Sequence, residues 1–178
     1  MIGNRRGRPP MRGSSRLSPR TPLPEAVPMA SRPPVDAVHE TSTPVRTKKR
    51  VVFVCIGNSC RSQMAEAFAR AYGSDIIEAS SAGVSPAADI APLTRKVVYE
   101  KNVGMEGQFP KGLEVVVQKD ADMIVNMSGL PLTARAVRMV TWRVPDPIGN
   151  SEMVFRKVAD EIEQMVMRLI LELRSSTL

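Results

Sequence analysis

A short apolar run, Val51-Val52-Phe53-Val54, constrains the fold of this chain more than any other feature, because a polar loop and a helical pattern follow it at once. Four β-branched and aromatic residues in a row predict a strand that is buried on both faces. From Gln63 onward apolar residues recur at helical spacing, and we expect Gly73 to end that helix. Such a buried strand that leads into a helix is typical of a parallel α/β sheet.

Strand-like and helix-like segments alternate along the rest of the chain. Strands are predicted at residues 76–79, 122–125 and, more weakly, 137–142, and helices at 92–101 and 113–119. A C-terminal helix, which we expect Ser151 to cap, has an apolar stripe made of Phe155, Val158, Ile162, Val166, Leu169 and Leu173. The alternation predicts an α/β fold with helices on both faces of a parallel sheet, and ligands in such folds bind beyond the carboxyl ends of the strands.

The first 49 residues differ from the rest in composition. They hold nine of the fifteen prolines, and residues 1–50 carry 11 Lys and Arg against 3 Asp and Glu, whereas residues 51–178 carry 14 against 15. Without apolar periodicity, ordering this segment costs more conformational entropy than its burial returns. We therefore expect a disordered basic tail at 1–49 and one catalytic domain at 50–178.

Several roles remain open for this tail. Its basic residues suit contact with nucleic acid or an anionic membrane, and an Arg-rich, acid-poor N-terminus also suits an organelle transit peptide. The alternatives are a passive solvated extension, or an upstream start codon with true initiation nearer Met29. Because we find no apolar run of membrane-spanning length and no secretory signal pattern, we expect a cytoplasmic protein.

The numbers of cysteines and histidines limit the chemistry. Cys55 and Cys60 are the only cysteines, which fits neither a disulfide framework nor a zinc site and favours a reducing compartment. The single histidine, His39, lies in the predicted tail, so the domain offers no Ser-His-Asp or Cys-His arrangement. A nucleophile must therefore be activated without imidazole, and we expect neither a metal nor a cofactor.

The loop after the first strand reads Cys55-Ile56-Gly57-Asn58-Ser59-Cys60-Arg61-Ser62. Successive backbone N–H groups in a tight loop that ends at a helix N-terminus form a concave cluster of donors suited to a tetrahedral oxyanion. Gly57 and Asn58 tolerate the positive φ angles that such curvature needs. A thiol among these donors is stabilised as the reactive thiolate, so Cys55 is the candidate nucleophile.

The side chains of this loop add to its chemistry. Arg61 can direct two donors onto two oxygens of a bound phosphoryl group, and Ser62 can hydrogen-bond the thiolate. Cys60 is either a redox-regulatory residue that forms a reversible disulfide with Cys55, or a small residue at the helix start. The opposing interpretation of the loop is an inert cysteine at a strand end and an ordinary helix cation. The coincidence of strand, turn, Cys-to-Arg spacing and helix argues against it.

Attack by a thiolate on a phosphate ester expels an alkoxide or phenoxide, which needs a proton from a nearby acid. Asp146, in Val144-Pro145-Asp146-Pro147-Ile148-Gly149, is the candidate. The flanking prolines hold its backbone extended in a loop between the last strand and the last helix. The alternative is a turn aspartate, which is common in Pro-rich loops.

Residues 49–173 resemble the low-molecular-weight protein tyrosine phosphatase family, to which one class of arsenate reductases is similar. The resemblance rests on VVFVCIGNSCRSQMAE, on SSAG after the second strand and on WRVPDP before the last helix. It implies a three-layer α/β fold with a four-stranded parallel sheet flanked by helices. It also implies a phosphocysteine intermediate on Cys55, phosphate held by Arg61, and proton donation by Asp146.

Departures from the family pattern bear on the substrate. Gln63 replaces the usual proline after the Arg-Ser pair, and Ile148 and Gly149 replace an aromatic pair, so a stacking wall for a phenol ring is not expected. The segment Gln63-Met64-Ala65-Glu66 is closer to the arsenate-reductase branch. Thioredoxin-coupled members of that branch use two further cysteines, and residues 126–128 supply none, so an internal disulfide relay is excluded.

Three functions follow, in order of preference. The first is a phosphatase that hydrolyses phosphomonoesters, nominally protein phosphotyrosine, so its partner is a phosphorylated protein or a small phosphomonoester. The second is an arsenate reductase, in which Cys55 binds arsenic from arsenate and an external small thiol completes the reduction. The third is a non-catalytic oxyanion-binding or adaptor protein whose basic tail does the recruiting.

Overall fold

The computed structural model describes residues 48–117, 121–134 and 136–176. The predicted tail at 1–49 lies outside these residues except for its last two positions, so its disorder stays a prediction. The elements in chain order are β1 (Lys49–Cys55), α1 (Arg61–Gly73), β2 (Ile77–Gly83), α2 (Pro92–Tyr99), α3 (Leu113–Val117), β3 (Ala121–Asn126), β4 (Ala136–Thr141) and α4 (Glu152–Ser175). Every predicted strand and helix is therefore present.

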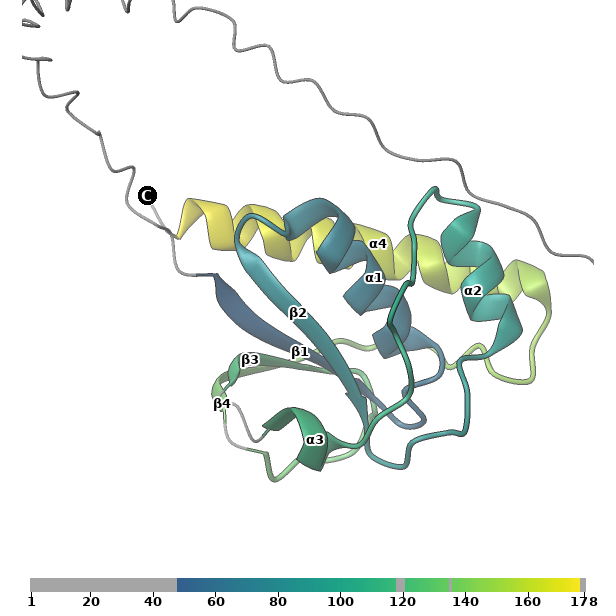
Figure 1. The fold of residues 1–178 in the computed structure, drawn as a ribbon, viewed down its shortest axis with the longest axis horizontal. Coiled ribbons are helices and arrows are strands. Elements are labelled where there is room, and N and C mark those ends of the chain that lie inside the picture. Colours follow the sequence, from purple (N-terminus) through teal and green to yellow (C-terminus); the bar gives the residue numbers. More distant parts are fainter. Residues whose placement is uncertain (1–47, 118–120, 135, 177–178) are drawn as a thin grey trace, which may run out of the picture. The chain divides into compact units, whose positions relative to one another are not determined.

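The four strands form one parallel sheet in the order β2-β1-β3-β4 (Figure 1). After β1 the chain moves to one side to make β2 and then returns past β1 to make β3 and β4. This change of direction lies between β1 and β3, and ligands bind at such switch points, beyond the carboxyl ends of the strands. Cys55 is the last residue of β1, opposite Gly83 of β2, so the predicted nucleophile stands at that point.

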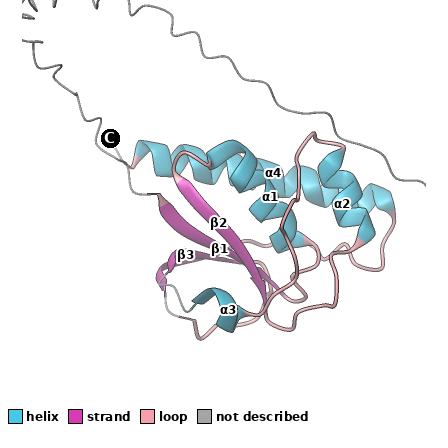
Figure 2. Ribbon diagram, in the orientation of Figure 1, coloured by secondary structure: helices cyan, strands magenta, loops and turns pink. Residues whose placement is uncertain are grey.

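Helices cover both faces of the sheet (Figure 2). Along β1, Val51, Phe53 and Cys55 belong to the larger core cluster, which includes α1 and α4, whereas Val52 and Val54 belong to a smaller one beneath α3. Successive side chains of a strand point to opposite faces, and both sets are buried, which explains why the strand reads as a continuous apolar run. The three-layer α/β architecture is as expected.

Helix α4 buries the stripe predicted from its sequence. All six residues of that stripe are buried, and Ala159 and Ile170 join them against α1 and the sheet. Ser151 occupies the N-cap position, but its side chain makes no capping hydrogen bond, contrary to expectation. Its backbone carbonyl instead accepts from the N–H groups of Val154 (2.9 Å) and Phe155 (3.2 Å).

Several predicted boundaries were wrong in ways that affect the site. Helix α1 begins at Arg61 rather than at Gln63, because the carbonyl of Cys60 already accepts from Met64 N–H (2.9 Å). The SSAG segment, residues 80–83, lies within β2 rather than after it. Helix α2 ends at Tyr99, two residues early, and the end of the helix predicted at 113–119 lies outside the described residues. None of the helices described is both long and apolar enough to span a membrane.

Candidate active site

The loop after β1 uses its carbonyl groups to bind the surrounding protein and keeps its N–H groups free. All six carbonyls from Cys55 to Cys60 accept hydrogen bonds of 2.9 to 3.1 Å. The donors, in order, are the N–H groups of Val84, Ser85 and Ala87, the side-chain amide of Gln63, and the N–H groups of Ala91 and Met64. Within the described part of the chain, nothing accepts from the N–H groups of Gly57 to Ser62. This curved row of donors at a helix N-terminus suits a tetrahedral oxyanion.

Asn58 is the residue that bends the loop. Its φ of 46° lies in the left-handed region, where asparagine is tolerated better than most residues. Gly57, which was expected to share this conformation, does not have a positive φ. The sheet also accommodates the bend, because a Cβ on Gly83 would lie 2.8 Å from the carbonyl oxygen of Ile56 and 3.0 Å from Asn58 N. Glycine at the end of SSAG therefore lets the loop approach β2.

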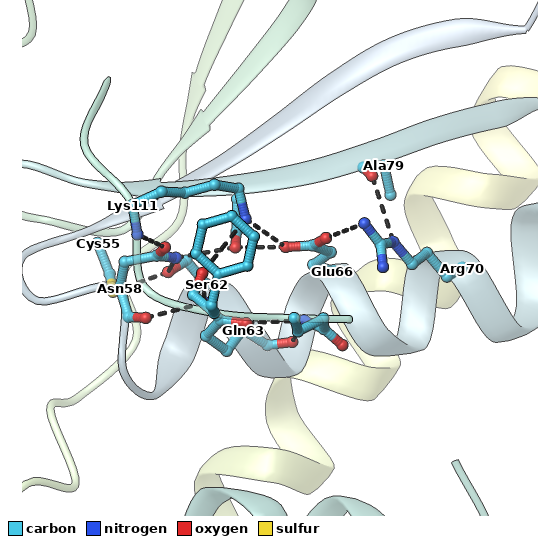
Figure 3. Close-up of polar contacts among 11 residues, drawn as sticks. Cys55, Asn58, Ser62, Gln63, Glu66, Arg70, Ala79 and Lys111 are labelled. Carbon is cyan, nitrogen blue, oxygen red and sulfur yellow. Dashed lines mark hydrogen bonds and ion pairs between the residues drawn. The ribbon is translucent and has the colours of Figure 1, made fainter. Parts of the chain in front are cut away.

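The side-chain amide of Asn58 orients the hydroxyl group beside the nucleophile (Figure 3). The backbone N–H of Lys111 donates to Asn58 Oδ1 (2.8 Å), which fixes the orientation of the amide. Asn58 Nδ2 then donates to Ser62 Oγ and to Ser81 Oγ, each at 2.8 Å. Since Ser62 accepts from Asn58, its own proton is free for Cys55 Sγ, 2.9 Å away. The sulfur of the candidate nucleophile therefore has a hydroxyl donor beside it.

The same chain of hydrogen bonds continues from Ser81 to Glu66, a carboxylate that is fully buried in α1. Ser81 accepts from Asn58 and donates to Glu66 Oε2. Two cations flank this carboxylate: Arg70, one turn along α1, and Lys111, whose Nζ is 3.5 Å from Oε2 (Figure 3). Sequence analysis quoted Glu66 and Ser81 within motifs but assigned them no role, because only the fold brings them beneath the loop.

A pair of buried glutamines also supports the loop, and sequence analysis missed its role. Gln63 Nε2 donates to the carbonyls of Asn58 and Phe109, both at 3.0 Å. Gln108 Nε2 in turn donates to Gln63 Oε1 (2.8 Å) and to Gln63 O (3.0 Å). Gln63 is fully buried and thus ties the loop after β1 to residues 108–109. A glutamine in place of the family's proline was the only signal in the sequence.

Arg61 is buried, and most of its guanidinium is already engaged. Nη1 donates to the carbonyls of Met127 (3.0 Å) and Val144 (3.1 Å), and Nη2 donates to Asp146 Oδ2. Its Nε is buried and finds no acceptor among the described residues. The sequence led us to expect a freely forked guanidinium. The structure instead shows a guanidinium held by hydrogen bonds to the protein, with Nε–H and one Nη2–H left for a bound anion.

Asp146 lies next to Arg61, as its predicted role requires. It is half-exposed, with 43% of its side chain accessible, and among the described residues Oδ1 accepts only from the N–H of Ile148 (3.2 Å). Asn150 closes the loop by donating to the carbonyls of Asp146 (3.4 Å) and Ile148 (3.3 Å). The loop between β4 and α4 thus holds a solvent-accessible carboxyl group beside the buried arginine.

Cys60 is a free thiol in this structure, as is Cys55, and both are buried. Burial raises the pKa of Cys60 to about 12, and negative charge on Cys55 and Asp146 acts in the same direction while Arg61 opposes it. Cys60 is therefore a neutral thiol at neutral pH. A disulfide between the two stays a prediction.

Comparison with known proteins agrees with this geometry. A sequence profile described as low molecular weight phosphotyrosine protein phosphatase matches residues 50–137. An arsenate reductase from Bacillus cereus strain 03BB102 is 34% identical over 129 residues, which is 70% of this chain and 96% of that protein.

Solved structures give the same result. An arsenate reductase in its phosphate-binding state superposes with a TM-score of 0.64 at 31% identity, covering 70% of this chain and 98% of its own. The arginine phosphatase YwlE from Geobacillus stearothermophilus has a TM-score of 0.63 at 25% identity, with 72% and 94% covered. This chain therefore belongs to the low molecular weight phosphotyrosine protein phosphatase family, close to its arsenate reductase branch.

Proposed function

We propose that this protein hydrolyses phosphomonoesters through a phosphocysteine intermediate on Cys55. The observation that carries the proposal is the convergence of three features at one strand end. These are the row of unpaired N–H groups, the sulfur bonded to Ser62, and the pair formed by Arg61 and Asp146. Family membership supports a cysteine-dependent enzyme with an oxyanion site, and the substrate and the reaction are our inference.

In the first step the Sγ of Cys55 attacks phosphorus while the bond to the leaving oxygen breaks. The free N–H groups of the loop, with Nε–H and one Nη2–H of Arg61, hold the non-bridging oxygens as charge develops on them. Asp146 gives its proton to the leaving oxygen. In the second step Asp146 takes a proton from water, the water oxygen attacks phosphorus, and the S–P bond breaks. Ser62 stabilises the thiolate that returns.

Hydrolysis of p-nitrophenyl phosphate tests this mechanism. We expect no turnover in Cys55→Ser and a fall in kcat of about 10²- to 10³-fold in Asp146→Asn. Asp160→Asn is the matched control, because Asp160 is exposed on α4 and pairs only with Lys101, so its kcat should match wild type. Full activity in Cys55→Ser would refute the proposal. Parallel assays with phosphotyrosine, a phosphate ester, and phosphoarginine, a phosphoramidate, would separate the two substrate classes suggested by the relatives.

A second candidate is arsenate reduction, because several of the similar proteins are named arsenate reductases. Cys55 would displace water from arsenate to form a thiol ester of arsenic(V). A small external thiol would then attack that sulfur, so that arsenic gains two electrons and leaves as arsenite while a mixed disulfide forms. A second thiol would release Cys55. Arsenite formation that requires an added small thiol, with no ester hydrolysis in wild type, would establish this reaction instead.

A further inference from the structure

Arg61 also lines a cavity to which the proposed mechanism assigns no part of the substrate. This cavity has a volume of about 590 Å³ and lies at the carboxyl ends of β3 and β4. One wall is the Asn126–Leu132 segment after β3, and the other is the Met139–Val144 segment at the end of β4. A space of this size suits a small molecule. We call it the Arg143 cavity.

The wall after β3 is held in place by its own hydrogen bonds. Asn126 Nδ2 donates to the carbonyl of Leu130 (2.8 Å), and Asn126 Oδ1 accepts from the N–H (2.9 Å) and the hydroxyl (2.7 Å) of Ser128. Ser128 Oγ in turn accepts from Leu130 N–H (3.1 Å). Because these polar groups are paired with one another, a ligand would contact mainly the apolar side chains of this wall. These side chains are already held in place before a ligand binds.

The charge of the cavity is one-sided. Among the residues that the structure describes, two arginines line it, and no aspartate or glutamate does. Arg61 is paired with Asp146, which is not a lining residue, so Arg61 adds little net charge. Arg143 is exposed and makes no hydrogen bond or ion pair with any residue that the structure describes. A free guanidinium beside apolar side chains fits an anion that has an apolar body.

We propose that the Arg143 cavity binds a small organic anion whose carboxylate pairs with Arg143. Its apolar body contacts Leu130, Leu132 and Met139, which supply apolar surface on the two walls. Arg61 and the carbonyl of Val144 belong to both this cavity and the catalytic site. The anion is therefore either the organic part of the substrate or a separate effector, and the same chemistry recognises both.

Trp142, the only tryptophan in the chain, lines the cavity and serves as a fluorescent reporter. Titration with 4-phenylbutyrate should give a saturable change in its emission. Uncharged 4-phenylbutyramide should bind at least tenfold more weakly, and Arg143→Ala should weaken phenylbutyrate at least fivefold. Trp142 also borders a second cavity, which contains Arg168. Arg168→Ala is therefore the matched control, and its affinity should equal that of wild type.

Two measurements, titration in saturating inorganic phosphate and steady-state kinetics, show whether the bound anion represents the organic part of the substrate or a separate effector. If phenylbutyrate raises only the KM for p-nitrophenyl phosphate, the cavity holds the organic part of the substrate; if it changes kcat, the cavity holds an effector. Binding that persists with phosphate present shows that the cavity is distinct from the phosphate site. The proposal fails if the emission change does not saturate, if the amide binds equally well, or if Arg168→Ala weakens binding and Arg143→Ala does not. Fluorescence needs no turnover, so failure of the proposed hydrolysis would leave this test intact.

Discussion

Replacing Gln63 with methionine tests whether the glutamine pair supports the catalytic loop. Methionine is close to glutamine in size and shape, so the change removes hydrogen bonds with little change in volume. It leaves the carbonyls of Asn58, a fully buried residue, and Phe109, which is 58% exposed, without their 3.0 Å donor. Water can reach Phe109, but an unpaired buried polar group such as the Asn58 carbonyl costs about 1–3 kcal/mol. We therefore expect the free energy of unfolding to fall by about 1–3 kcal/mol.

Urea denaturation measures this loss, and Gln164→Met is the matched control. Gln164 is exposed on α4 and makes no described hydrogen bond, so its substitution should stay within about 0.5 kcal/mol of wild type. Gln63→Glu keeps an acceptor for Gln108 but loses both donors, so it should resemble Gln63→Met rather than wild type.

The kinetic consequence follows from the strained backbone of Asn58. Without its carbonyl anchor, a residue with a φ of 46° relaxes, and the N–H groups beside it move relative to the phosphate. A displacement of about 1 Å costs up to about 10²-fold in rate. We expect kcat/KM for p-nitrophenyl phosphate to fall tenfold or more in Gln63→Met. The reasoning is refuted if the variant matches wild type in both the free energy of unfolding and kcat/KM. If the variant loses stability but keeps its kcat/KM, Gln63 contributes only to the stability of the fold.

Three further predictions concern the surroundings of the loop. Gly83→Ala places a Cβ 2.8 Å from the carbonyl oxygen of Ile56 in the loop. Urea denaturation should show the free energy of unfolding falling by about 1–3 kcal/mol, and phosphate should bind more weakly. Unchanged phosphate affinity would contradict this prediction. Lys111→Met leaves buried Glu66 with one cation, so the free energy of unfolding should fall by about 1–3 kcal/mol. The control Lys96→Met breaks an exposed pair and should cost at most about 1 kcal/mol. The pKa of Cys60 is raised to about 12, so iodoacetamide at neutral pH should label Cys55 before Cys60. Peptide mass spectrometry measures this order, and Cys60 should react only as the pH approaches its pKa. Equal labelling of the native protein would contradict it.

Much of the fold could be predicted because the relevant signals are local. The apolar run Val51–Val54 indicates a strand buried on both faces, and the α4 stripe indicates an amphipathic helix, whatever else surrounds them. Element ends were less predictable, since they depend on single hydrogen bonds. The bond from Met64 N–H to the carbonyl of Cys60, which starts α1 at Arg61, leaves no trace in the periodicity.

The candidate site divides in the same way. Cys55, Arg61 and Ser62 could be identified from spacing, because they lie within one short loop whose residue types suit an oxyanion. The partners of that loop come from distant segments. Ser81 and Lys111 contact it only because β2 lies beside β1 and the chain then returns to the loop. Gln108 acts through Gln63, whose amide donates to the loop.

The sequence by itself determined the order of strands and helices, and it picked out the candidate loop after β1 and the candidate acid before α4, because periodicity and residue type act over a few positions. Only the tertiary structure decided which hydroxyl proton points at Cys55, which N–H groups of Arg61 stay free, and where an unpaired Arg143 borders a cavity. These features depend on hydrogen bonds between segments far apart in the chain, and their partners are set by the packing of the whole sheet rather than by any local pattern.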